Sequence, residues 1–225
     1  MPFRRDLLTE SATIKRELSE GYLLSYLYYE NGSIRYDGLP PRDRFSRPVD
    51  NDTLFFTHST GKSIFSYIVG HAICEGYISS ADETIDWPLM ANTVYDGQSL
   101  QDLLNMSAGD SHVVTNGASR VVGAGTHHRD MGIDTIANYL QGTERSGGGV
   151  FYNNVLTDII ASYVAYRAGD NYERLLRRVF QDKIHIGNDV YFELHRRTPT
   201  EGRQSPYYGQ LQTRASYSFL MTRED

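Results

Sequence analysis

The spacing of apolar residues along the chain predicts several helices and one β-hairpin. In several segments apolar side chains recur every three to four positions, the period of a helix with one buried face. A run rich in aromatic residues and leucine leads into Asn31-Gly32, a pair typical of a two-residue turn between strands. The predicted helices are residues 7–20, 62–75, 100–106, 134–140, 154–168 and 172–182, and the predicted strands are residues 22–30 and 33–37.

The order of these elements favours an α+β fold. A helix and a hairpin come first, a proline-containing loop follows over residues 38–52, and a short β-like run at residues 53–57 precedes a mainly helical region. This order lacks the strand–helix alternation of a doubly wound sheet. Two or three strands cannot make a stable sheet with a closed edge. We therefore expect the rest of the sheet to be missing from this chain, or its edge to be covered.

Composition narrows the classes of function and of site. The 225 residues carry a net charge of −6, which disfavours a nucleic-acid partner because phosphate binding requires a positive surface. Cys74 is the single cysteine, so neither an internal disulfide nor a cysteine-based metal site can form. Its apolar neighbours predict a buried thiol. We expect no metal and no cofactor.

The N-terminal stretch predicts a protein without a secretory signal. It is too polar for the apolar part of a leader, and no apolar run approaches the ~18 residues of a membrane helix. We expect a cytoplasmic protein, or a periplasmic one if the true start of the gene lies upstream.

The first candidate for chemistry is the pair Ser59 and Lys62, a Ser-x-x-Lys at the start of a predicted helix. A separation of three residues places both side chains on one face of a helix, so the lysine amine can reach the serine hydroxyl. A hydroxyl needs such a neighbour to become a nucleophile. The same residues also match the end of a phosphate-binding loop, Gly61-Lys62-Ser63. Phe56 stands where that motif requires a glycine, which disfavours phosphate binding.

The second candidate is Tyr152 with Asn154, a Tyr-x-Asn between a glycine-rich stretch and an apolar helix. A phenol beside a lysine ammonium loses its proton more easily and can relay protons. The asparagine amide can donate to and accept from a substrate amide. The alternative is a packed tyrosine with Asn154 as the helix cap. His127 and His128 could suggest a metal site, but a polar loop explains adjacent histidines better.

Ser-x-x-Lys followed by Tyr-x-Asn resembles the serine β-lactamase and penicillin-binding-protein superfamily, and most closely the class C β-lactamase-like group of esterases and 6-aminohexanoate-dimer hydrolases. Intervening segments agree. Residues 70–88 resemble the stretch after the nucleophile helix, residues 100–109 resemble the Leu-Leu-x-Met-x-Ser-Gly signature, and residues 209–221 resemble a later helix of the group.

The resemblance implies a β-lactamase/transpeptidase-like fold with a site on named residues. Ser59 would attack an ester or amide carbonyl, Lys62 and Tyr152 would move protons, and Asn154 would bind substrate. Residues 1–60 would belong to the sheet subdomain and residues 61–225 to a mainly helical subdomain. The strand with the third motif, of the Lys-Thr-Gly or His-x-Gly type, should follow, and we expect it to be absent before Asp225.

Two functions remain open from the sequence. The first is a serine hydrolase that acts on an ester, an amide or a β-lactam through an acyl-Ser59 intermediate, with a small molecule as its substrate. The second is a catalytically inert binding module of the same fold, or an inactive fragment. The missing third motif predicts that residues 1–225 alone are poorly stable and essentially inactive. The oligomeric state cannot be predicted from these patterns.

Overall fold

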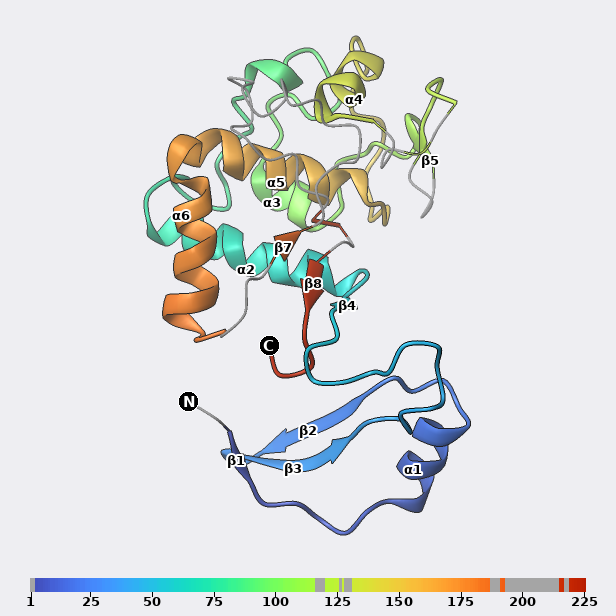
Figure 1. Cartoon of the computed structure of the whole chain (residues 1–225). Helices are drawn as coiled ribbons and strands as arrows, with labels where there is room; N and C mark the ends of the chain where they lie inside the picture. Colours follow the sequence, from blue (N-terminus) through green and yellow to red (C-terminus); the bar gives the residue numbers. More distant parts are fainter. Residues whose placement is uncertain are drawn as a thin grey trace. The chain divides into compact units, whose positions relative to one another are not determined.

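The computed structural model divides the chain into two compact units. The first consists of Met1–Phe55 and Met221–Asp225, and the second of Phe56–Leu220. Figure 1 shows the elements of both units. The structure describes residues 3–115, 120–125, 127, 131–186, 191–192, 215–216 and 219–225.

The first unit contains a small sheet and one helix. Its elements are β1 (Arg4–Arg5), α1 (Ala12–Ser19), β2 (Tyr26–Glu30) and β3 (Ser33–Gly38), and the sheet order is β1-β3-β2. Strands β2 and β3 pair antiparallel, which confirms the predicted hairpin, whereas β1 pairs parallel to β3. Asn31 and Gly32 both have positive φ angles, of 50° and 78°, as the tight turn between two twisted strands requires.

Capping explains why the first helix begins later than its apolar pattern predicts. The side chain of Ser11 accepts a hydrogen bond from the backbone N–H of Ile14, so the helix starts at Ala12 and not at residue 7. Leu7 and Leu8 precede the helix and are exposed, while Leu18 is buried. The strand predicted from residue 22 likewise begins only at Tyr26.

The second unit is mainly helical. Its helices are α2 (Thr60–Cys74), η1 (Pro88–Met90), α3 (Leu100–Leu104), α4 (Ile133–Tyr139), α5 (Val155–Ala168), η3 (Gly169–Asn171), α6 (Tyr172–Arg177) and the π-helical η4 (Arg178–Lys183). Its short strands are β5 (Val114–Thr115), β6 (Arg120–Val121) and β7 (Tyr191–Phe192). The strands β4 (Phe55–Phe56) and β8 (Phe219–Met221) each contain the chain boundary between the units, and the sheet orders are β4-β8-β7 and β5-β6. No helix among the described residues has the length and apolar character to cross a membrane.

Helix α5 is the centre of this unit. Almost all of its side chains are buried, and α2, α3, α4 and α6 all pack against it. A helix that is apolar on every side needs neighbours all round. Helices α2 and α5 begin at the same end of the unit (Figure 1), which brings together the two segments that carry the candidate residues.

Several expectations about local structure are wrong. The helix predicted over residues 134–140 begins at Ile133, with Gly132 as its N-cap residue and Asp134 in its first turn. Residues 114–115 and 120–121 pair as two short antiparallel strands that the sequence did not predict. Residues 219–221 form β8 and not a helix, while residues 209–214 lie outside the described part of the chain. Cys74 is exposed, because it falls off the buried stripe of α2.

Candidate active site

The turn between β4 and α2 presents the Ser59 hydroxyl. Ser59 is the N-cap residue of α2, yet its side chain makes no capping hydrogen bond. His58, directly before it, has a φ of +48°, a left-handed conformation that is costly for a residue with a Cβ atom. Such backbone strain is often found at functional positions. The turn therefore leaves an exposed hydroxyl that is not committed to the helix end.

The Lys62 amine lies at the centre of the candidate site. Its Nζ is 3.2 Å from the Oγ of Ser59, 2.5 Å from the Oδ1 of Asn154 and 2.7 Å from the backbone oxygen of Ser216. A lysine ammonium has three N–H donors and no acceptor. Three oxygens from three separate segments therefore match its full donor capacity.

Tyr152 lies beside the same amine. The Nζ of Lys62 is 4.9 Å from the centre of the Tyr152 ring, a cation–π distance, and half of the tyrosine remains exposed. Burial raises the pKa of the Tyr152 phenol, but hydrogen bonding to Ser59 and Lys62 and the positive charge of Lys62 outweigh it and leave that pKa below its usual value. The phenol is thus easier to ionise than a free tyrosine.

Asn153 and Asn154 have different tasks at the start of α5. The Oδ1 of the fully buried Asn153 accepts a hydrogen bond from the backbone N–H of Leu156, while the Asn154 side chain makes no capping bond. Asn154 is thus the N-cap residue by position, as the alternative expects, but its side chain does not make the capping bond. With the capping done by its neighbour, the Asn154 amide can face Lys62.

The buried carboxylate of Asp110 holds Asn153 in place at the start of α5. The Nδ2 of Asn153 donates to the Oδ2 of Asp110 over 3.1 Å, and the Tyr95 hydroxyl donates to the same oxygen over 2.8 Å. Burial is the main cause that raises the pKa of the Asp110 carboxyl. The carboxyl pKa is raised even though Tyr95 and Asn153 both favour its charged form.

All four residues singled out by the sequence motifs meet at this place, and two others join them. Ser216 was missed because it contributes a backbone oxygen, which any residue type can supply. Asp158 was missed although a signal exists: it is a carboxylate in a mostly apolar helix, and buried carboxylates require partners. One of its partners is Ser216.

The other readings of the sequence find less support. The Lys62 amine donates to Ser59, Asn154 and Ser216, so its hydrogen bonds are already used within the protein and none is needed for a phosphate. A His-x-Gly triplet does occur in the chain, at residues 185–187, so the expectation that none follows the helical region needs correction. It does not serve as a third-motif strand in the described part, because His185 and Ile186 follow the η4 helix and Gly187 lies outside that part.

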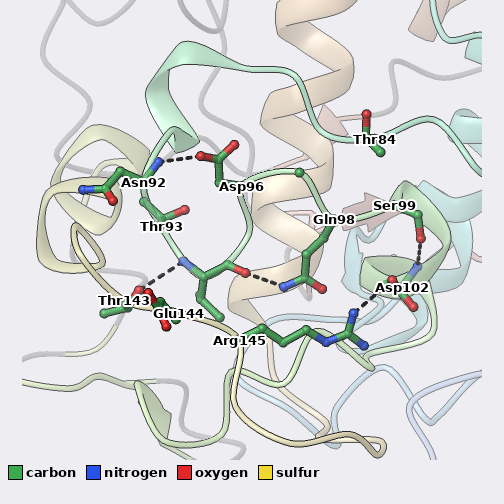
Figure 2. A pocket seen from close by; sticks show the side chains of 12 residues that line it. Thr84, Asn92, Thr93, Asp96, Gln98, Ser99, Asp102, Thr143, Glu144 and Arg145 are labelled. Carbon is green, nitrogen blue, oxygen red and sulfur yellow. Dashed lines mark hydrogen bonds and ion pairs between the residues drawn. The ribbon is translucent and has the colours of Figure 1, made fainter.

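A separate cavity of about 610 Å³ lies away from Ser59, between the segment before α3 and the loop after α4. Figure 2 shows that the residues lining it bond to one another, in most cases from a side chain to the backbone. The Nε2 of Gln98 donates to the Val94 carbonyl, and the Thr143 hydroxyl accepts from the N–H of Val94. Arg145 pairs with Asp102 at 3.4 Å. None of the four candidate residues lines it.

Solved structures similar to this chain include class C β-lactamases and a penicillin-binding-protein homologue. The alignment with a class C β-lactamase from Rhodobacter sphaeroides covers 82% of this chain and 52% of the β-lactamase, at 17% identity and a TM-score of 0.57. The chain therefore has the β-lactamase/transpeptidase-like fold. A penicillin-binding-protein homologue from Caulobacter crescentus matches 92% of this chain with 64% of its own (17% identity, TM-score 0.54). The alignment with a β-lactamase/D-alanine carboxypeptidase from Pseudomonas syringae covers 86% of this chain and 55% of that protein (15% identity, TM-score 0.53).

The likeness is confined to structure and to part of each relative. No protein-family model matches the chain, and no curated protein sequence matches it. The chain spans between about half and two thirds of the length of these solved structures. The sequence resemblance to the serine β-lactamase and penicillin-binding-protein superfamily is thus confirmed at the level of its α+β fold.

Proposed function

We propose that this chain carries the catalytic groups of a serine hydrolase that cleaves ester or amide bonds through an acyl-Ser59 intermediate. The single observation that carries the proposal is the contact of Lys62 with both Ser59 and Asn154, residues from two different helix starts. A nucleophile, a nearby acid–base group and a residue that orients them are the parts that acyl transfer requires.

In the acylation step, Tyr152 acts as the base. Its phenolate takes the proton of the Ser59 hydroxyl while the Oγ forms a bond to the carbonyl carbon of the substrate. The negative charge moves to the carbonyl oxygen. Tyr152 then gives its proton to the departing oxygen or nitrogen as the carbon–heteroatom bond breaks. The positive charge of Lys62 favours the phenolate form.

The second step releases the acyl group by the same chemistry. Tyr152 accepts a proton from a water molecule, the hydroxide oxygen bonds to the acyl carbon, and the bond to the Ser59 Oγ breaks. The serine oxygen recovers its proton from Tyr152. The enzyme therefore returns to its starting protonation state, and one water is consumed for each ester or amide bond.

The start of α2 offers a donor for the negative carbonyl oxygen. In the first turn, the N–H groups of Thr60, Gly61 and Lys62 donate to backbone carbonyls. Among the described residues, no backbone carbonyl accepts from the Ser59 N–H. Free N–H groups at a helix N-terminus stabilise negative charge. This supports a role for the Ser59 N–H in holding the oxyanion.

We expect slow turnover from residues 1–225 by themselves. The resemblance to the family implies a second oxyanion donor on the third-motif strand, and His185 and Ile186 of the His-x-Gly triplet do not form a strand in the part of the chain that the structure describes. Loss of one such donor costs about 10²–10³ in rate. Acylation by a reactive probe is less demanding than turnover of an ester, so labelling of Ser59 is the better first measurement.

The test is covalent labelling of the full chain by a fluorophosphonate, by a fluorescent penicillin and by an acylating p-nitrophenyl ester. The proposal expects one label per chain on the Ser59 peptide, located by mass spectrometry, and none in Ser59→Ala. Ser63→Ala is the matched control, because Ser63 lies one turn along the same helix. Labelling by the penicillin would narrow the substrate class to β-lactams, and labelling by the ester alone would narrow it to esters and amides.

Two results would overturn this proposal. Labelling that persists in Ser59→Ala would remove Ser59 from the mechanism. No labelling of a folded wild-type chain by any of the three probes would favour the inert binding module that the sequence left open.

A further inference from the structure

Asp158 is a buried carboxylate in the first turn of α5, a helix that is buried along almost its whole length. A carboxylate in such a place is costly unless hydrogen bonds satisfy it. One of its partners is Ser216, which is fully buried. The Oδ1 of Asp158 accepts from the Ser216 backbone N–H over 2.9 Å, and the Oδ2 accepts from the Ser216 hydroxyl over 3.3 Å.

Hydrogen bonds restrain the backbone N–H and the side chain of Ser216, and its carbonyl oxygen contacts Lys62. While its N–H and its hydroxyl donate to Asp158, its backbone oxygen accepts from the Nζ of Lys62 over 2.7 Å. Two hydrogen bonds to one carboxylate fix a residue better than one does, because they restrain both position and rotation. Since the carbonyl belongs to the restrained residue, its oxygen is held where the ammonium needs an acceptor.

Helix α5 therefore contacts Lys62 by two routes. Asn154, at its N-cap, accepts directly from the lysine. Asp158 lies four positions later, where residues share one face of a helix, and reaches the lysine through Ser216. The backbone N–H of Asp158 also donates to the Asn154 carbonyl over 3.3 Å, so the two positions move as one body.

We infer that Asp158 is a positioning residue, which holds the Ser216 carbonyl against Lys62 and thereby sets the direction of the lysine ammonium toward Ser59. This inference deepens the proposed function and rests on it for its catalytic meaning. Without the carboxylate, the Ser216 carbonyl loses its restraint, and the ammonium can turn away from Ser59. A displacement of about 1 Å in a catalytic group can cost about 10²-fold in rate.

The chain offers a direct spectroscopic test because Lys15, Lys62 and Lys183 are its only lysines. Lysine labelled with ¹³C at Cε gives one resolvable signal for each, and Lys62→Arg identifies the signal of Lys62. In Asp158→Ala we expect the Lys62 signal to move toward the position of the two other lysines. In the same variant the rate of Ser59 labelling by a fluorophosphonate should fall by about 10²-fold.

Two further variants separate positioning from general stability. Ser162→Ala is the matched control: Ser162 is equally buried on α5, but its hydroxyl donates only to the Asp158 backbone oxygen, over 2.8 Å. It should leave both the Lys62 signal and the labelling rate as in the wild type. Asp158→Asn keeps an oxygen that can accept from the Ser216 N–H, so it should restore most of the wild-type Lys62 signal.

A folded Asp158→Ala chain with an unchanged Lys62 signal would overturn the inference, even if its thermal stability had dropped. If Asp158→Ala does not fold, the Lys62 signal is measured in Asp158→Glu instead. This variant keeps the charge but displaces the acceptor oxygens by one methylene, and an unchanged signal would again overturn the inference. The lysine spectrum is recorded without any probe. Failure of the wild-type chain to become labelled would therefore count against the proposed function alone.

Discussion

The Nζ of Lys62 lies 2.5 Å from the Oδ1 of Asn154, a residue 92 positions further along the chain. The amide oxygen accepts a hydrogen bond from the ammonium without neutralising its charge. Lys62 can therefore be oriented by one partner and still act electrostatically on another, Tyr152. This division explains why an amide, and not a carboxylate, suits this position.

Asn154→Asp should move the pH dependence of Ser59 labelling to higher pH. The new carboxylate would compensate the charge of Lys62 and repel the Tyr152 phenolate, and both effects raise the pKa of the phenol. The measurement is the labelling rate from pH 6 to 10 in the variant and in Asn138→Asp, an exposed change on α4 that should have no such effect. A shift of the profile to lower pH would contradict this account of the site.

Removal of the phenol should have a larger effect than removal of any other hydroxyl near the site except Ser59. Tyr152→Phe keeps the ring that lies beside Lys62 but loses the proton-transferring oxygen. We expect labelling to slow by about 10²–10⁴-fold, the usual contribution of acid–base help. Tyr139→Phe on the exposed side of α4 is the control. A loss of less than about fivefold in Tyr152→Phe would assign the base to another group.

The wild-type labelling rate should rise with pH through the pKa of Tyr152, which lies below the usual value of 10. Labelling requires the phenolate, so activity is lost as the pH falls through that pKa. Lys62→Met removes the hydrogen bond and the charge that lower the pKa and leaves the burial that raises it. The midpoint of the profile should therefore move upward in Lys62→Met. Equal midpoints in the two proteins would mean that Tyr152 does not sense Lys62.

Asp110 should make the chain less stable as the pH rises. Burial raises the pKa of its carboxyl above 3.8 in the folded state. Its contribution to stability is present below the unfolded pKa and is lost as the pH rises through the folded one. Asp110→Asn cannot ionise and keeps an oxygen for Tyr95 and Asn153. We expect Asp110→Asn to have a higher free energy of unfolding in urea than the wild type at pH 7, and this difference should be smaller at pH 4.

The exposed Asp82 provides the control for that comparison. Asp82→Asn removes an equal charge from the surface and should leave the difference from the wild type nearly constant between pH 4 and 7. If Asp110→Asn behaved in the same way as Asp82→Asn, the buried carboxyl would not be a source of pH-dependent stability.

The sequence predicted the long helices well because their apolar periodicity is strong. Helix α2 runs from Thr60 to Cys74, against a prediction of 62–75, and α5 matches its predicted range within one residue. The strands of two or three residues had no comparable signal. Their pairing, as between β7 and β8, depends on partners that are distant in the sequence. A two-residue strand is too short for alternation to be recognised.

The candidate site was predictable as far as it consists of side chains in motifs. Ser59, Lys62, Tyr152 and Asn154 were found in this way, and the structure brings them together. The oxygen of Ser216 was not predictable, because a backbone carbonyl leaves no trace in residue type. Asp158 could have been noticed as a charge in an apolar helix, but its partner could not have been named from the sequence.

The Lys62–Ser216 contact joins positions that are 154 residues apart, and this has a consequence for protein synthesis. A nascent chain that has emerged through α5 already contains Ser59, Lys62, Tyr152 and Asn154. It does not yet contain the oxygen that completes the set of acceptors around the ammonium. At ribosomal rates of roughly 5–20 residues per second, this gap lasts for seconds. The ammonium therefore gains its full set of acceptors only after the segment that carries Ser216 has been synthesised, well after α5.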